Sequence, residues 1–427
     1  MRFVNRFQSS VLGMILAMGL SCSAMAEEVE PPKYEPLPLS EIRRFADIYE
    51  RIKSAYVEPV SDEQLLLDAV RGMMSGLDPH STYLDKDEFN NLREHTSGEY
   101  GGLGIELTFE RPYVKVISPI DGSPAKLAGV RSGDLISELD GTPVGNLTMT
   151  EIIDQMRGEP GAPIELTILR ETEEKPLTIT VVRDIIPLQS VRSQMLEDGY
   201  GYARISQFQA NTGKDLRKAL EALNQKSLRG FILDLRDNPG GLLSSAVEVV
   251  DAFIDEGKIV YTEGRIEHSD QTFSATADTV MPDTPLIILI NAGSASASEI
   301  VAGALQDQKR AILMGETTFG KGSVQTILPV GQNEAIKITT ARYFTPNGRS
   351  IQATGIEPDV YVGAAEVTFF EARHQVTEKD LSGHLENSDA ENNNDKDDEH
   401  QTRLREDFQL FEALSLLKAL HIVNPAR

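Results

Sequence analysis

The sequence has little cysteine, a deficit of positive charge and, beyond its N-terminus, no long apolar run. Its 427 residues include one cysteine, Cys22, and 41 Lys and Arg against 66 Asp and Glu, for a formal net charge of −25. A surface of that sign repels phosphate backbones, so nucleic acid is not expected as a partner. No later stretch approaches the roughly eighteen consecutive apolar residues that a transmembrane helix needs, so no transmembrane segment is expected in the mature chain.

The N-terminus has the parts of a secretory signal peptide. Two early arginines precede an apolar run over residues 11–20, and residues 24–26 (Ala-Met-Ala) form a small-residue cleavage site. Removal of residues 1–26 leaves no cysteine, which excludes disulfides, thiol catalysis and thiolate metal sites together. The signal-peptide pattern predicts export to the periplasm. A lipoprotein signal ending at Cys22 is the alternative, disfavoured because the leucine before that cysteine lies two positions away, not three.

Hydrophobic periodicity divides the rest of the chain into regions of different kinds. Apolar residues at helical spacing over about residues 40–74 predict two or three helices. Alternating runs that start near residue 97 predict half-buried strands. Beyond residue 184, apolar strands end in Gly or Ser turns that lead into helices, an order typical of α/β layers. The expected regions are 27–96 (helical), 97–184 (β-rich), 185–365 (α/β core), 366–402 (acidic linker) and 403–427 (C-terminal amphipathic helix).

The acidic linker and the last helix make assembly a question that the sequence itself raises. Residues 378–399 contain nine acidic residues, two lysines and no aromatic residue, a composition that favours a solvated segment. A short apolar-striped helix beyond it is marginal alone and needs a partner surface. We expect self-association through the terminal helices, because a long tether favours reaching another subunit. Docking on the chain's own core is the alternative.

The histidines do not provide a base where the glycine and serine turns concentrate. Seven histidines occur, and none lies between residues 284 and 345. The sequence contains neither a recognisable Ser-His-Asp order nor a His-Glu-x-x-His metal motif. A nucleophile in this region needs another base.

A lysine in this region can act as the general base. Residues 291–299 (Asn-Ala-Gly-Ser-Ala-Ser-Ala-Ser-Glu) follow a buried strand and open a helix, where backbone N–H groups can stabilise an oxyanion. Lys321, between two glycines, could serve as general base if burial lowers its pKa. Gln325 lies four positions on and shares its face in either helix or strand, so its amide could hold the amine. Simple helix capping and a solvated turn are the competing interpretations. A phosphate loop is excluded because glycine follows Lys321.

Residues 291–325 resemble the catalytic region of the carboxyl-terminal processing peptidases, the tail-specific proteases. The shared motifs are Gly-Ser-Ala-Ser-Ala-Ser-Glu, Ala-Leu-Gln-Asp and Thr-Phe-Gly-Lys-Gly-x-Val-Gln. The resemblance implies that Ser296 is the nucleophile, Lys321 the base and Gln325 the supporting amide. Ser294 and Ser298 are then only neighbours.

The same resemblance extends over about residues 40–360 and implies further assignments. The oxyanion donors correspond to the backbone N–H of Ala297 and of a glycine in residues 237–241, either Gly241, which we favour, or Gly240. His80, in a matching Leu-Asp-Pro-His-Ser motif, is then structural and not catalytic.

The β-rich region resembles a bacterial PDZ module. Its Gly102-Leu103-Gly104-Ile105 is similar to the carboxylate-binding loop, and residues 129–136 are similar to a strand entry typical of these domains. Successive backbone N–H groups in such a loop can bind a terminal carboxylate while an extended peptide adds to the sheet edge. The resemblance thus implies that Leu103, Gly104 and Ile105 bind the substrate's C-terminus.

Together these features predict an α/β protease core, layered and crotonase-like, with an inserted β-rich PDZ domain and helical terminal regions. The expected function is that of a periplasmic serine endopeptidase which recognises protein C-termini and cleaves through a Ser–Lys acyl-enzyme. Expected partners are proteins or peptides with free C-termini, a second copy of the chain and an envelope adaptor protein; no metal or other cofactor is expected. Two alternatives remain. A catalytically inactive PDZ scaffold is disfavoured by the intact Ser–Lys–Gln set, and an acyl-CoA hydratase or isomerase is disfavoured by export.

Overall fold

The computed structural model describes residues 37–225, 228–266, 269–331, 333–365, 383 and 407–423. The predicted signal peptide and all of the predicted linker except Gly383 lie outside these described residues. The chain divides into two units, residues 1–69 and 70–427, each described by itself. Within the described ranges, no helix is both long and apolar enough to cross a membrane.

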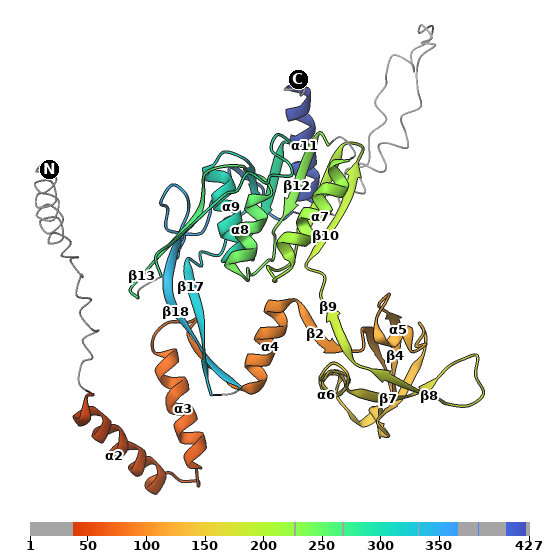
Figure 1. Cartoon of the computed structure of the whole chain (residues 1–427), viewed down its shortest axis with the longest axis vertical. Helices are drawn as coiled ribbons and strands as arrows, with labels where there is room; N and C mark the ends of the chain where they lie inside the picture. The colour runs from red at the N-terminus through yellow and green to blue at the C-terminus, as the bar shows by residue number, and fades with distance from the viewer. Residues whose placement is uncertain are drawn as a thin grey trace, which may run out of the picture. The chain divides into compact units, whose positions relative to one another are not determined.

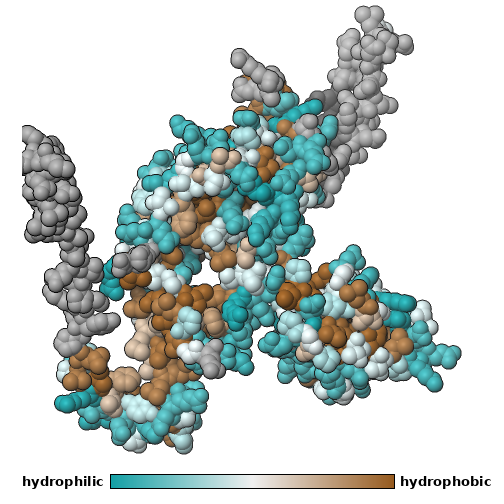
Figure 2. Space-filling view, in the orientation of Figure 1, coloured by the Kyte–Doolittle hydropathy of each residue, from teal (hydrophilic) through white to brown (hydrophobic). Residues whose placement is uncertain are grey.

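The first unit contains α2 (Leu39–Ala55) and the start of α3 (Asp62–Ser75), within the two or three helices that the spacing predicts (Figure 1). The turn between the helices is held by Asp62, which accepts a hydrogen bond from Tyr49 and pairs with Lys53 at 2.5 Å. None of the residues of α2 is buried. Its apolar row is 43–50% exposed: Ile42, Phe45, Ile48 and Ile52. Figure 2 shows hydrophobic side chains in brown on the surface of this segment.

The PDZ domain is built on one antiparallel sheet in the order β3-β4-β5-β7-β8, with β6 paired to β5. Alternate residues of β7, Ile164, Leu166 and Ile168, are at most 1% exposed, as a sheet with one buried face requires. The strands are β3 (Ile105–Glu110), β4 (Tyr113–Pro119), β5 (Leu135–Leu139), β6 (Thr142–Pro143), β7 (Pro163–Leu169) and β8 (Leu177–Val182), and the helices are α5 (Pro124–Leu127), α6 (Met149–Met156) and the 3₁₀ turn η1 (Val144–Asn146).

The two ends of the PDZ domain lie side by side, which is how an inserted domain attaches. Strand β2 (Glu99–Gly102) enters the domain and pairs antiparallel with β9 (Asp184–Pro187), which leaves it. Before β2 comes α4 (Lys86–Ser97), which begins at a capping box of Asp85 and Glu88 and ends at Gly98 in the left-handed conformation.

The core contains a six-stranded sheet in the order β10-β11-β12-β15-β16-β19, parallel except at its β10 edge. Strands β12 and β15 are buried on both faces, which explains their continuous apolar runs. One face packs on helices α7, α8 and α9. The elements are β10 (Val191–Glu197), β11 (Tyr200–Ile205), β12 (Gly230–Asp234), β15 (Leu286–Ile290), β16 (Ile312–Gly315), β19 (Val360–Tyr361), α7 (Thr212–Asn224), α8 (Leu243–Asp251) and α9 (Ala297–Asp307).

A second, antiparallel sheet carries the lysine loop. Its order is β1-β18-β13-β14, with β17 also paired to β18. These strands are β1 (Thr82–Leu84), β13 (Lys258–Gly264), β14 (Gln271–Ser274), β17 (Ser323–Val330) and β18 (Glu334–Phe344). The fold is therefore the predicted α/β core with an inserted PDZ domain and helical terminal regions.

The C-terminal helix α11 (Phe408–Val423) corrects the prediction that this helix docks on another subunit. Its Ala413, Leu414 and Leu417 are at most 5% exposed and pack on the other face of the six-stranded sheet, against Ile232 and Ile287 (Figure 1). A mainly parallel sheet must be covered on both faces, and α7, α8 and α9 cover only one. Alternate residues of β12 and β15 provide the surface on which α11 docks. The prediction from the length of the linker did not consider this surface.

Candidate active site

Ser296 occupies a strained position at the start of α9. The buried strand β15 ends at Ile290, and the chain turns so that Ser296 becomes the N-cap of the helix with φ 56°. A positive φ is costly for serine, and such strain is concentrated at functional sites. Among the described residues the N–H of Ala297, in the first turn, has no hydrogen-bond acceptor, so this donor is free.

The two neighbouring serines have structural partners. The Ser294 hydroxyl donates to the Leu235 carbonyl at 2.8 Å, and the Ser298 hydroxyl donates to the Asn238 carbonyl at 2.9 Å. Both serines are fully buried, whereas Ser296 is partly exposed. Of the three, Ser296 is the one placed to meet a substrate.

The glycine loop after β12 lies against the nucleophile turn. A Cβ added to Gly240 would lie 2.8 Å from the Ser296 Cβ and 3.0 Å from the Ala297 nitrogen, so only glycine allows this approach. The Gly240 N–H donates to the Asn238 side chain at 2.9 Å. Within the described part of the chain the Gly241 N–H has no acceptor. Of the two predicted glycines, Gly241 is therefore the one whose backbone N–H is free to bind an oxyanion.

Glu299 is a central residue that the sequence argument did not single out. Its carboxylate is fully buried and joins the serine turn to the lysine loop. It accepts hydrogen bonds from the Ser296 N–H (2.7 Å), the Thr318 hydroxyl (2.6 Å), the Gly320 N–H (2.7 Å) and the Lys321 N–H (2.9 Å). The available signal was its position, because an acid three residues after a serine N-cap is where a capping box places it.

Lys321 is half-buried just before β17. Burial lowers the pKa of its ammonium below the ordinary lysine value, and the positive charge of Lys337 on β18 lowers that pKa further, against the weaker opposing effects of Asp78 and Glu299. Among the described residues no carboxylate pairs with the Lys321 amine and no group accepts a hydrogen bond from it. A desolvated, unpaired lysine is the kind that can act as a neutral base.

Gln325 lies nearby but has other partners. Its amide donates to the Ser323 hydroxyl at 2.9 Å and to the Thr339 hydroxyl at 3.4 Å. The shared-face argument does not hold for this pair, because Lys321 lies outside β17 and the strand register shifts between Val324 and Gln325. The role of Gln325 beside the lysine stays a prediction.

The predicted PDZ loop lines a groove. A cavity of about 280 Å³ is bordered by Leu103, Gly104 and Ile105 on one side and by apolar side chains of α6, such as Ile153 and Met156, on the other. Such a groove combines a loop of backbone N–H groups with room for an apolar side chain.

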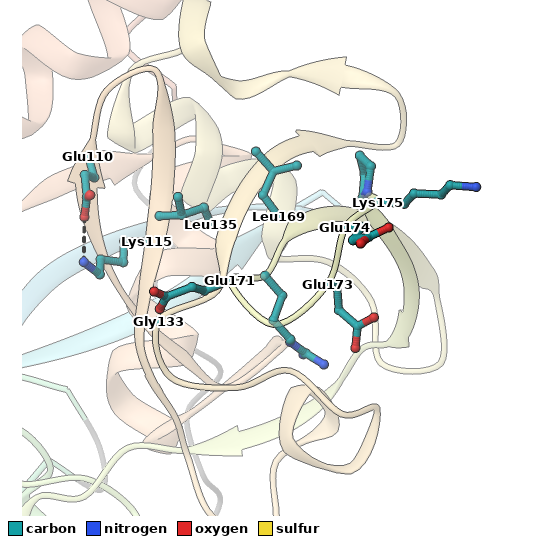
Figure 3. Close-up of a pocket in the computed structure, with 11 residues that line it drawn as sticks. Glu110, Lys115, Gly133, Leu135, Leu169, Glu171, Glu173, Glu174 and Lys175 are labelled. Carbon is teal, nitrogen blue, oxygen red and sulfur yellow. Dashed lines mark ion pairs between the residues drawn. The ribbon is translucent and has the colours of Figure 1, made fainter.

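A second, larger PDZ cavity has a mixed acidic and basic lining. This cavity of about 400 Å³ is shown in Figure 3, and four glutamates and three cations line it: Glu110, Glu171, Glu173, Glu174, Lys115, Arg170 and Lys175. Glu110 is paired with Lys115 at 2.9 Å. This cavity contains neither the predicted loop nor the apolar side chains of α6, so the groove at Leu103 is the better candidate for a chain end.

Comparison with protein-family profiles identifies three regions of the chain. The profile of Peptidase family S41 matches residues 199–362, a PDZ domain profile matches residues 115–170, and a profile described as the activating protease CtpB N-terminal domain matches residues 19–88. An α/β core of this family joined to a PDZ domain defines the chain as a serine peptidase that carries a peptide-binding module.

Curated relatives cover most of the chain. The carboxy-terminal-processing protease of Bartonella bacilliformis is 45% identical over 88% of this chain and 88% of its own length. The carboxyl-terminal-processing protease of Synechocystis sp. is 36% identical over 75% and 76%, and the carboxy-terminal processing protease CtpA of Bacillus subtilis is 35% identical over 73% and 67%. The chain belongs to the carboxy-terminal-processing proteases, which confirms the resemblance drawn from residues 291–325.

Proposed function

We propose that the protein is a periplasmic endopeptidase that binds a protein's C-terminus in its PDZ groove and cleaves the chain through an acyl-enzyme on Ser296. The observation that carries the proposal is the joining of three segments at one strained serine. The helix start supplies a nucleophile, the glycine loop lies against that turn and supplies a free N–H, and Glu299 ties the helix start to the loop of a desolvated lysine.

The proposed reaction uses the lysine as the proton carrier. The neutral Lys321 amine accepts the Ser296 hydroxyl proton as Oγ bonds to the scissile carbonyl carbon. The Ala297 and Gly241 N–H groups stabilise the resulting oxyanion. The ammonium then protonates the leaving amine, the C–N bond breaks, and a water activated by the same lysine hydrolyses the ester. In this scheme Gln325 exchanges Ser323 for the lysine amine when substrate binds.

Substrate selection is assigned to the PDZ groove. The carboxylate of a free C-terminus would accept hydrogen bonds from the loop of Leu103, Gly104 and Ile105, and the side chains of α6 would favour an apolar terminal residue. The names of the relatives, which are processing proteases for carboxyl termini, support this assignment.

Location and assembly are part of the proposal. The N-terminal pattern of residues 1–26 supports export to the periplasm, where an adaptor protein is a further candidate partner. The exposed apolar row of α2 supports self-association through the N-terminal helices, because α11 already covers its own sheet. Light scattering of the mature chain and of the same chain without residues 27–55 tests this; equal subunit numbers would contradict it.

Substitution of the nucleophile tests the function itself. Ser296→Ala is expected to abolish cleavage of proteins with apolar C-termini while the chain remains folded, because Ser294 and Ser298 are held elsewhere. Ser193→Ala, on the exposed edge strand β10, is the matched control and should cleave normally. Mass spectrometry of envelope proteins that accumulate in a Ser296→Ala strain would identify substrates. Undiminished cleavage by Ser296→Ala would contradict the proposal, and absence of any accumulating protein would favour a scaffold.

A further inference from the structure

Tyr343 lies between the two halves of the proposed catalytic machinery. It belongs to β18, is 2% exposed, and shares the main hydrophobic core with Ala297 and Ile300 of α9. Its backbone N–H donates to the Gly322 carbonyl at 3.0 Å, directly after Lys321. The residue is therefore fixed to the lysine loop by its backbone, and its side chain belongs to the same hydrophobic core as the nucleophile helix.

The Tyr343 hydroxyl has no hydrogen-bond partner among the described residues. A buried hydroxyl without a partner costs stability, whereas phenylalanine would fill the same space without that cost. The packing of the core therefore does not explain why a tyrosine stands here. A functional requirement for the hydroxyl in the active site would explain the tyrosine.

The hydroxyl has one neighbouring hydroxyl that matters, that of Ser296. Burial raises the pKa of Tyr343 well above its ordinary value, the Glu299 carboxylate raises it further, and the nearby Ser296 hydroxyl acts in the opposite direction. Tyr343 is thus neutral near pH 7. It is a hydrogen-bond donor that does not give up its proton.

We infer that Tyr343 donates a hydrogen bond to Oγ of Ser296 when that oxygen attacks, and so belongs to the catalytic residues. The inference rests on the proposed function, since it assigns a partner to the same nucleophile. As Oγ bonds to the carbonyl carbon, its proton passes to Lys321, and the Tyr343 proton stays on Tyr343 while its hydrogen bond stabilises the charge that develops on Oγ. When the ester is hydrolysed, the same bond stabilises Oγ as it leaves.

Tyr343→Phe isolates the hydroxyl from the ring. We expect kcat to fall about tenfold to a hundredfold with KM unchanged, as for loss of one hydrogen bond made mainly in the transition state. Labelling of Ser296 by a fluorophosphonate should slow by a similar factor. The thermal midpoint should stay equal or rise, because an unpartnered buried hydroxyl has been removed. A purely structural role predicts the opposite combination, a lower midpoint and an unchanged labelling rate per folded molecule.

Tyr261→Phe is the matched control. Tyr261 lies on β13, the strand paired with β18, and its ring stacks on Phe344 with centroids 5.2 Å apart. It should cleave and label at the wild-type rate. Wild-type kcat and labelling in Tyr343→Phe would overturn the inference and leave the proposed function intact, provided that Ser296→Ala is inactive. Activity in Ser296→Ala would instead overturn the proposed function.

A structure of the wild-type chain with a phosphonate on Ser296 provides a test that needs no variant. A Tyr343 hydroxyl within about 3.2 Å of Oγ is the expected result. A separation beyond about 4 Å, with the hydroxyl directed elsewhere, would overturn the inference even if Tyr343→Phe failed to fold.

Discussion

The pKa of Lys321 is set by its surroundings more than by a hydrogen-bonded partner. Burial is the larger cause of its lowered pKa, and the Lys337 ammonium is the second. In the proposed mechanism protonated Lys321 cannot accept the serine proton, so activity should be lost as the pH falls through this pKa. The pKa of the proposed base is therefore tuned by a residue that has no part in the proposed reaction.

Lys337→Ala should make this tuning visible. Removal of the like charge raises the pKa of Lys321, so the acid limb of the kcat/KM profile moves to higher pH and the rate near pH 7 falls about threefold to tenfold. Lys337→Arg retains the charge and should leave the limb in place. Coincident acid limbs for wild type and Lys337→Ala would show that Lys337 does not act on the base.

At the same scale, sequence reasoning proposed the candidate catalytic residues but not the contacts that hold them. Ser296 and Lys321 are recognisable because their local patterns, a serine at a helix start and a lysine between glycines, have few structural uses. Glu299 was not predicted because some of its four partners lie up to 22 residues away in the sequence. A capping motif involves only residues within one helical turn. The Gln325 contact was predicted from its spacing of four residues from Lys321, in helix or strand. The register shift between Val324 and Gln325 removes that argument and leaves the contact a prediction.

At the scale of elements, α11 is anchored beside the glycine loop. Arg236, next to that loop, donates to the Asp407 carboxylate at 2.9 and 2.7 Å, and to Asp234 at 2.7 Å. Asp407 also accepts from the Leu410 N–H and so caps the helix. Burial alone would raise the pKa of Asp407, but Arg236 and the Leu410 N–H outweigh it and leave that pKa below its ordinary value.

Asp407→Asn should therefore loosen α11. We expect amide hydrogen exchange over residues 408–423 to accelerate about tenfold, for a loss of about 1–2 kcal/mol from a partly exposed charged pair. Because the pKa of Asp407 is depressed in the folded state, its contribution is present above the unfolded pKa and lost as the pH falls through the folded pKa, so wild type and variant should converge in acid. Lys418→Ala removes another ion pair of the same helix, to Glu197 at 2.6 Å, and should change exchange little. Equal exchange in wild type and Asp407→Asn at pH 7 would contradict the anchoring role.

Secondary structure was predicted correctly where a local sequence pattern determines it. The docking partner of a helix was predicted wrongly because it depends on the topology of the sheet. The alternating runs that start near residue 97 predicted half-buried strands, and the apolar runs beyond residue 184 predicted strands of an α/β core. Strands β7 and β15 confirm these predictions. The partner of α11 depends on which sheet face the other helices leave open. That choice follows from the strand order β12-β15-β16, which no single segment of the sequence contains.

At the scale of the whole molecule, the proposed function combines a groove for chain ends with a site for peptide-bond cleavage. Amidation of a peptide's C-terminus removes the charge that the loop at Leu103 to Ile105 is proposed to bind. We expect kcat/KM for the amide to fall at least about tenfold relative to the free acid of identical sequence. Acetylation of the N-terminus is the control and should have no effect. Equal rates for acid and amide would show that the groove does not select substrates.

Lys321→Arg tests the proposed catalytic pair of Ser296 and Lys321 most directly. Arginine retains the charge and much of the length of lysine but stays protonated throughout the accessible pH range. We expect that Lys321→Arg and Lys321→Ala both fold and that neither cleaves a substrate with a free C-terminus at any pH. Cleavage at the wild-type rate by either variant would contradict the proposed pair.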